Sequence, residues 1–151
     1  QATRDNQIVF GSAQQTYQAP GVTSALSEAR QLSEPLQLVN TDSAGNLATD
    51  GGFLYQQTLE NRQGVAIALA TEAPDLVAGE QFGMAMNWGT FDGASAVAFT
   101  ASGVFAQDLI EPGRGRLSIN AGAAVAVTEE NKAGHSVGSS IGGRAGLQFT
   151  W

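Results

Sequence analysis

The stretch RLSINAGAAVAVT, residues 116–128, places apolar side chains at every second position and small or polar ones between them. A repeat of two residues is typical of a β-strand, because successive side chains point to opposite faces of a sheet. The same alternation occurs in three more segments of this half of the chain: Gln81–Phe91, Ala96–Ala106 and Ser140–Trp151. The sequence therefore predicts four consecutive strands, each with a bulky apolar face and a face of small residues.

Ionised side chains are nearly absent from these four segments. Only Arg116, at a strand start, and Arg144, on a small-residue face, carry charge, while other charged residues collect in the connections. A soluble sheet usually solvates its outer face with charged residues, whereas a Lys or Arg that faces lipid costs ~2–4 kcal/mol at the bilayer midplane. Each segment also has the ~9–11 residues needed to cross a bilayer. We therefore expect transmembrane strands whose bulky faces contact lipid.

Four strands are too few to close a membrane barrel, and an open sheet edge in hydrocarbon leaves backbone groups unpaired. We therefore expect several copies of the chain to combine. Two copies would supply about eight strands, whose interior holds side chains but no helix. Three copies would supply a twelve-stranded barrel with a wider lumen, and the small inner faces suit a lumen filled by helices. The sequence alone leaves an assembly of four copies open.

Residues 1–52 are predicted to hold only short elements. They contain a strand candidate at Gln7–Phe10, a short helix within Val22–Leu32, and a hairpin whose arms are Leu36–Val39 and Asn46–Ala48. The short helix should end before the following proline, because the residue before a proline avoids the α region. We interpret this region as a small β-rich segment ahead of a longer helix.

Residues 53–79 are predicted to form a helix, Phe53–Ala73, and the linker that follows it. Apolar residues recur in this segment at helical spacing. Its second part, Gly64–Ala70, alternates Ala with larger residues, so its periodicity fits a buried strand equally well. Residues 80–151 then form the four-stranded membrane region.

Composition excludes several classes of function. The chain of 151 residues has a net charge of −7, so it lacks the clustered basic residues that nucleic acid requires. It contains no Cys and a single histidine, His135, which we expect on the surface of an exposed Gly-rich loop. No nearby motif gives that histidine a catalytic or metal-binding partner. We therefore expect no enzymatic activity and no metal or cofactor.

The order of helix, proline, glycine, four strands and terminal aromatic residue resembles the membrane anchor of trimeric autotransporter adhesins (YadA-like). The resemblance covers roughly residues 58–151 and lies in GVAIALATEAPDLVAGEQ (64–81), FGMAMNWGTFDGASAVAFTASG (82–103) and IGGRAGLQFTW (141–151). Near the start, RDNQIVFGSAQQTYQAPG resembles a head or neck repeat and LQLVNTDSAGNLATDGG resembles an interruption before a final coiled coil.

This resemblance implies a homotrimer that builds one twelve-stranded barrel in the bacterial outer membrane, with its helices leaving through the lumen. The anchor would export its own passenger and display it at the cell surface for adhesion to a host or surface ligand. Residues 91–94 and 128–139 would be extracellular loops, and residues 107–115 a periplasmic turn. Phe149 and Trp151 would belong to the signal read by the barrel-assembly machinery.

Several residues are candidates for contact between the lumen and the helix. Arg144 should point into the lumen, where Glu72, Asp75 or Glu60 could pair with it and pin the helix. The alternative is that Arg144 extends its charged group into a wet lumen. The resemblance also implies a small residue facing the lumen near the middle of the first strand, a role that Asn87 or Gly89 would fill. A competing interpretation of the whole chain is a soluble trimeric β-rich fibre or binding module, in which the aromatic residues are ordinary core.

Overall fold

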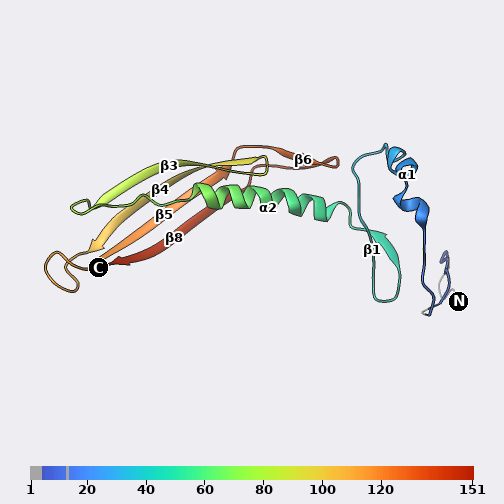
Figure 1. Ribbon diagram of the computed structural model, residues 1–151, viewed down its shortest axis with the longest axis horizontal. Coiled ribbons are helices and arrows are strands. Elements are labelled where there is room, and N and C mark those ends of the chain that lie inside the picture. The colour runs from blue at the N-terminus through green and yellow to red at the C-terminus, as the bar shows by residue number, and fades with distance from the viewer. Residues whose placement is uncertain (1–4, 13) are drawn as a thin grey trace. The chain divides into compact units, whose positions relative to one another are not determined.

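The computed structural model of the protein describes residues 5–12 and 14–151, and its largest element is a sheet of four long antiparallel strands (Figure 1). The strands pair in the order β3-β4-β5-β8. They are β3 (Phe82–Phe91), β4 (Ala94–Ala106), β5 (Arg116–Ala126) and β8 (Ile141–Thr150). The predicted antiparallel sheet is thereby confirmed. Within the described part of the chain, β3 and β8 each pair with one strand, so they are the two edges of the sheet.

The two faces of the sheet differ as the alternation predicts. One face carries exposed bulky residues from all four strands: Met84, Met86, Trp88, Phe99, Phe105, Ile119, Val125, Ile141, Leu147 and Phe149. The register places these residues opposite one another, for example Met86 opposite Phe99 and Ile119 opposite Leu147. The opposite face carries small and polar residues. We call these the outer face and the inner face.

The turn between β3 and β4 consists of only Asp92 and Gly93. Both residues have positive φ angles, 47° and 93°, which is the backbone conformation of the tightest hairpin turns. This turn and the connection between β5 and β8 lie at the same end of the sheet, because all neighbouring strands are antiparallel. We call this end the rim.

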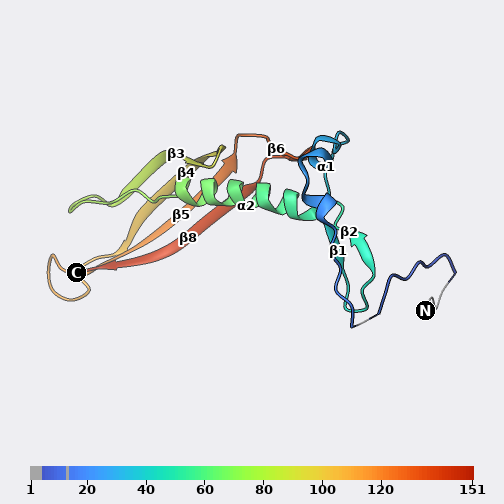
Figure 2. The same ribbon diagram turned by 45° about the vertical axis from the view of Figure 1, so that its right-hand side comes forward.

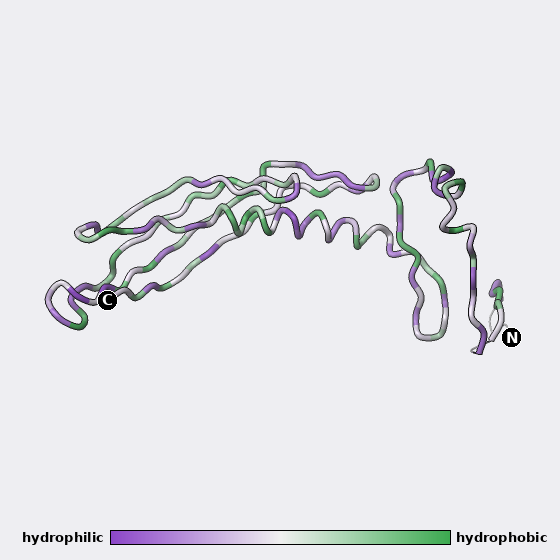
Figure 3. The backbone as a smooth tube through the Cα atoms, viewed as in Figure 1, coloured by the Kyte–Doolittle hydropathy of each residue, from purple (hydrophilic) through white to green (hydrophobic). Residues whose placement is uncertain are grey.

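Helix α2 (Phe53–Ala70) packs along the inner face of the sheet (Figures 1 and 2). The run Gly64–Ala70, whose periodicity also fitted a strand, is therefore helical. Figure 3 shows that α2 changes from a mainly hydrophilic first half to a mainly hydrophobic second half. The second half lies against the sheet, with Ala66, Ile67 and Ala70 buried. In the region bounded by residues 35 and 151, this helix–sheet contact forms the main apolar core.

The helix begins and ends for identifiable reasons. The Asp50 carboxylate accepts hydrogen bonds from the backbone N–H groups of Gly52 (2.8 Å) and Leu54 (3.2 Å), which satisfies donors of the first turn. At the other end α2 stops at Ala70, three residues before the predicted end at Ala73. Proline at position 74 excludes the residue before it from the helical region, and the backbone that follows Ala70 bonds to the sheet.

Two short hairpins accompany α2. One pairs β1 (Val39–Thr41) with β2 (Leu47–Thr49). A hairpin was predicted here, but its first strand begins at Val39, three residues after the predicted start, and its second strand begins one residue after the predicted start. The other pairs β6 (Glu130–Lys132) with β7 (His135–Val137) and lies within the segment 128–139, for which only a loop was predicted. The second hairpin packs on the first half of α2, which explains why three-residue strands are formed there.

The chain divides into two units, Gln1–Glu34 and Pro35–Trp151, so the β1-β2 hairpin belongs with the sheet rather than with the first residues. The described part of the first unit contains a 3₁₀ turn at Pro20–Thr23 and helix α1 (Ala25–Ala29). Ser24 separates the two because its side chain accepts a hydrogen bond from the Ser27 N–H and caps α1. The strand predicted at Gln7–Phe10 is wrong: that segment is not a strand, and four residues offer little apolar surface to bury.

The pKa of the Asp50 carboxyl lies below its ordinary value of 3.8, chiefly because the Gly52 N–H donates to the ionised group. A lowered pKa in the folded state means that this group contributes its full stabilisation at neutral pH and loses it as the pH falls below 3.8 through the lowered value. We expect the Gly52 and Leu54 amides to lose protection over that acid range in hydrogen exchange. The Asp50→Asn variant should lack this pH dependence, and an unchanged acid profile in that variant would contradict the assignment.

Candidate functional site: the seat of the helix

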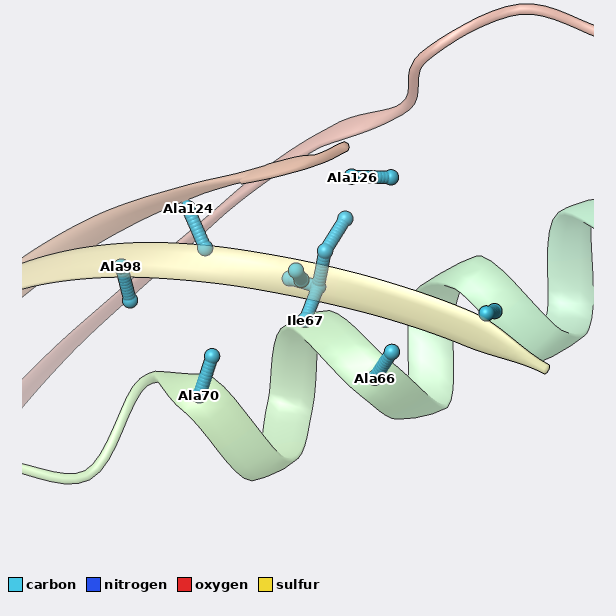
Figure 4. Close-up of a cluster of buried hydrophobic side chains, with 8 residues drawn as sticks. Ala66, Ile67, Ala70, Ala98, Ala124 and Ala126 are labelled. Atoms are coloured by element: carbon cyan, nitrogen blue, oxygen red, sulfur yellow. The ribbon is translucent and has the colours of Figure 1, made fainter. Parts of the chain in front are cut away.

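The contact between α2 and the inner face is built almost entirely from alanine and glycine. Ala66, Ile67 and Ala70 of the helix meet a set of buried alanines on β4 and β5 (Figure 4): Ala94, Ala96, Ala98, Ala124 and Ala126. Small side chains allow the helix backbone to lie close to the strands. We call this contact between α2 and the inner face the seat of the helix. It is the candidate site of this protein, because it holds a helix on the face of the sheet opposite the exposed apolar residues.

The closest approach occurs at Gly89 in β3. A Cβ atom added there would lie against the Ala66 carbonyl oxygen and within 2.6 Å of the Ala70 nitrogen. Both are backbone atoms of the helix, so a side chain could be accommodated only if the helix moved. Gly89 and Asn87, the two residues proposed for the middle of the first strand, therefore both face the helix side of the sheet.

Below the last turn of α2, the chain is held to the sheet by hydrogen bonds from side chains to backbone. The Glu72 carbonyl accepts bonds from Asn87 Nδ2 (2.7 Å) and from the buried Thr100 Oγ1 (2.9 Å). Further along, Arg116 donates to the carbonyls of Leu76 (3.3 Å), Val77 (3.1 Å) and Glu80 (3.0 Å). The linker between α2 and β3 is thus fixed along the inner face by the side chains of Asn87, Thr100 and Arg116.

At the rim, the helix is held by Gln63, whose side chain is fully buried. Its Nε2 donates to the Thr128 carbonyl (3.1 Å), and its Oε1 accepts from the Ser140 N–H (3.1 Å) and hydroxyl (2.6 Å). Thr128 and Ser140 stand at the two ends of the connection between β5 and β8. One amide of α2 therefore joins both strands where they leave the sheet.

The neighbouring residue, Arg62, carries the ion pairs of the rim. It pairs with Asp92 in the β3-β4 turn at 2.8 Å and with Glu130 in the second hairpin at 3.8 Å. The side chain of Arg62 is 23% exposed and that of Glu130 only 9%, so solvent screens this pair less than a pair on an open surface. The side chain of Asp92 is 59% exposed, and its pair with Arg62 is screened more strongly. Arg62 thus joins the helix to the β3-β4 turn and to the β6-β7 hairpin, two segments that are distant from each other in sequence.

His135 does not lie on an exposed loop, and that prediction is wrong. Its ring is 6% exposed, stacks on Tyr55 of α2 at a centroid distance of 5.6 Å, and bonds through Nε2 to the Leu36 carbonyl. Gly52, with a φ of 85°, makes room for the ring, because a Cβ at that position would clash with it. The β6-β7 hairpin is thereby attached to the first turn of α2 and to the segment before β1.

The predicted pairing of Arg144 with an acidic residue of the helix is not formed within the described chain. Arg144 lines a groove of about 510 Å³ between α2 and β8, together with Ile67 and Thr71. Glu72 and Asp75 are exposed, and Glu72 contacts the sheet through its carbonyl oxygen rather than through its carboxylate. At the end of the chain, Phe149 and Trp151 stack at a centroid distance of 5.8 Å and are exposed.

The sequence analysis missed Gln63, Arg62, Thr100 and Arg116 as contacts. For Gln63 a signal existed, because it is a polar residue in a row with Leu59 and Ile67 at helical spacing. For the other three, the partners are backbone atoms or side chains of elements distant in sequence, which no local pattern indicates.

No protein-family model matches this chain, and neither a curated protein nor a solved structure is found to match it. Among the described residues, no group of His, Cys, Asp or Glu is placed to hold a metal ion. No helix in that part of the chain is long and apolar enough to cross a membrane. The geometry of the seat is therefore the evidence from which a function can be argued.

Replacement of Gly89 by alanine tests the close approach. The added Cβ meets helix backbone, so we expect Gly89→Ala to destabilise the protein by about 1–3 kcal/mol through overpacking. Gly103→Ala is the matched control, because a Cβ on that glycine of β4 meets nothing closer than 3.8 Å. Thermal unfolding of the two variants compares them directly. Equal stabilities would show that α2 does not lie as close to β3 as described.

Proposed function

We propose that the chain is the outer-membrane anchor and translocation domain of a trimeric autotransporter adhesin, which displays a passenger at the surface of a bacterium. The observation that carries the proposal is the contrast between the two faces of the four-stranded sheet. Its outer face exposes bulky apolar residues on every strand, while its inner face receives a helix through alanine and glycine.

The exposed apolar residues support contact with lipid. Trp88 is 63% exposed, Met86 77% and Leu147 73%, and they lie on strands whose outer positions carry no charge. Soluble monomers rarely expose contiguous apolar surface of this kind without a partner. In a membrane, lipid acyl chains cover such a face. A sheet of this length that faced water would carry charged residues there.

The two edges of the sheet support assembly from several copies. β3 and β8 each have ten residues, and each has one side without a strand partner among residues 5–12 and 14–151. Long edges with few charged residues pair readily with other strands: β3 has none and β8 has only Arg144. In lipid, the backbone groups of such edges must be paired. Pairing β8 of one copy with β3 of the next closes a barrel, and three copies give the twelve strands that leave room for helices.

The inner face supports a role in export. It combines small residues with polar ones such as Thr100, Asn120 and Gln148, and these suit a lumen through which a hydrated chain passes. After export the helices remain in the lumen and connect the passenger to the barrel. The passenger then adheres to its ligand, lipid surrounds the barrel, and the barrel-assembly machinery recognises the C-terminal aromatic residues.

A denaturing gel of unheated and boiled membrane extracts tests the proposal. The chain is expressed with an outer-membrane signal peptide. We expect a detergent-dependent band at three times the monomer mass that collapses to the monomer on boiling. A monodisperse species that stays in solution without detergent would overturn the proposal in favour of the soluble fibre or binding module.

A charge on the outer face should block assembly in a manner that depends on its depth. Phe99→Lys places a cation in the middle of β4 and should cost about 2–4 kcal/mol, with marked loss of the heat-resistant trimer. Phe105→Lys makes the same change on an exposed residue near the end of the same strand, where the cost falls to about 0–1 kcal/mol. The amount of trimer in membranes is the readout. Equal tolerance of the two variants would argue against a bilayer around this face.

A further inference from the structure

A movement of α2 along its axis by one turn would still leave one alanine of the helix against the alanines of the sheet. Ala66 and Ala70 are four residues apart, so a shift of one turn, about 5.4 Å, brings one alanine to the place of the other. Their partners on the inner face are alanines as well. The alanine part of this contact has no directional bonds, so the axial position of α2 depends on the polar contacts of the helix and of the linker that follows it.

One row of side chains on the helix would not be equivalent after a shift by one turn. Leu59, Gln63 and Ile67 follow one another at intervals of four residues and are all buried. Only Gln63 has polar atoms, and it uses both of them at the rim. A shift by one turn in either direction would bring Leu59 or Ile67 to this place. The Thr128 carbonyl and the Ser140 donors would then face an apolar side chain, and a buried polar group without a partner is costly.

Arg62 strengthens the same position. A shift by one turn would place Thr58 or Ala66 opposite Asp92 and Glu130. Neither residue carries a positive charge, so neither can form an ion pair with these carboxylates. Gln63 and Arg62 are adjacent, and both bind connections at the rim rather than the middle of the sheet. Directional contacts of α2 itself with the sheet connections therefore favour a single axial position.

We propose that Gln63 is the stop that defines the axial position at which the exported helix comes to rest in the lumen. This inference rests on the proposed function. While the chain passes outward, alanine and glycine slide along the inner face without strong directional bonds. When Gln63 reaches the rim, its amide bonds to both ends of the β5-β8 connection and holds the helix there. The groups that bind Gln63 belong to the same chain, at the two ends of the β5-β8 connection.

Paired cysteines can report the position of the helix, because the chain has no cysteine of its own. A Cβ at Gly142 would lie 3.8 Å from the Ile67 Cβ, within the usual range for a disulfide. The pair Ile67→Cys and Gly142→Cys therefore reports the seated helix. The pair Thr71→Cys and Gly142→Cys reports a helix displaced outward by one turn. Both pairs are introduced into the full chain, oxidised in membranes, and measured as cross-linked peptides by mass spectrometry.

The decisive variant is Gln63→Leu, which keeps the approximate size of the side chain and removes its amide. In the unaltered background we expect the seated cross-link to predominate. In Gln63→Leu we expect the ratio of seated to displaced cross-link to fall about tenfold, the factor that corresponds to the loss of a buried hydrogen bond. Gln57→Leu makes the same change at an exposed position of α2 and should leave the ratio unaltered.

A ratio in Gln63→Leu within twofold of the unaltered background would overturn the inference. If Gln63→Leu does not assemble, Ser140→Ala removes one of the three bonds to Gln63 while retaining the backbone donor, and the ratio should fall severalfold. An unchanged ratio in Ser140→Ala would overturn the inference equally. The outcome is separable from the proposed function: loss of the heat-resistant trimer with an intact seated cross-link would refute the membrane anchor, whereas a trimer with an unaltered ratio would refute only the stop.

Discussion

The close approach of the α2 backbone to the inner face of the sheet is the constraint on which the rest of this structure depends. A helix with large side chains would stand farther from the strands, and the bonds from Asn87, Thr100 and Gln63 would not reach their partners. Gly89 and the alanine cluster permit the approach. The apolar surface buried in this way is small, because alanine has little of it to bury, so the polar contacts at both ends of the contact carry much of its specificity.

Apolar packing contacts and hydrogen-bonded contacts of the helix lie at different places along its length. The middle of the contact is alanine against alanine, while the rim holds Gln63 and Arg62, and the linker is held by Arg116. In the export that we propose, the helix first moves through the lumen, which requires contacts without directional bonds, and then remains at a defined position, which requires directional ones. The distribution of contacts fits both requirements without any part of the chain changing its fold.

Much of the sheet could be predicted, because the strands repeat every two residues and the side chains of each face share one character. The boundaries of β3 and β8 follow directly from that alternation. The helix was ambiguous at Gly64–Ala70, where alanine fits both a helix and a strand, and its packing on the sheet resolves the ambiguity. The helix ends at Ala70 rather than at the predicted Ala73, because the backbone after Ala70 is hydrogen-bonded by side chains of the sheet. A local sequence pattern carries no information about such partners.

The candidate site was less predictable for the same physical reason. Gly89 and Asn87 could be placed on the inner face by counting along one strand. Gln63 bonds to residues 65 and 77 positions away, and His135 stacks on a tyrosine eighty residues earlier in the chain. For Arg144 the sequence left open whether it pairs with an acidic residue of the helix or extends into a wet lumen; among the described residues it forms no ion pair with Glu72 or Asp75 and lines an open groove beside β8. Contacts of this kind arise from tertiary packing and leave no periodic trace in the sequence.

Quenching of Trp88 fluorescence tests the central claim, that the outer face of the sheet lies in lipid. Trp88 is exposed on the middle part of β3, and Trp151→Phe makes it the only tryptophan of the chain. In reconstituted membranes, lipids brominated on their acyl chains should quench Trp88 strongly, and acrylamide in the water should quench it weakly. Strong quenching by acrylamide with no effect of the brominated lipids would contradict the account.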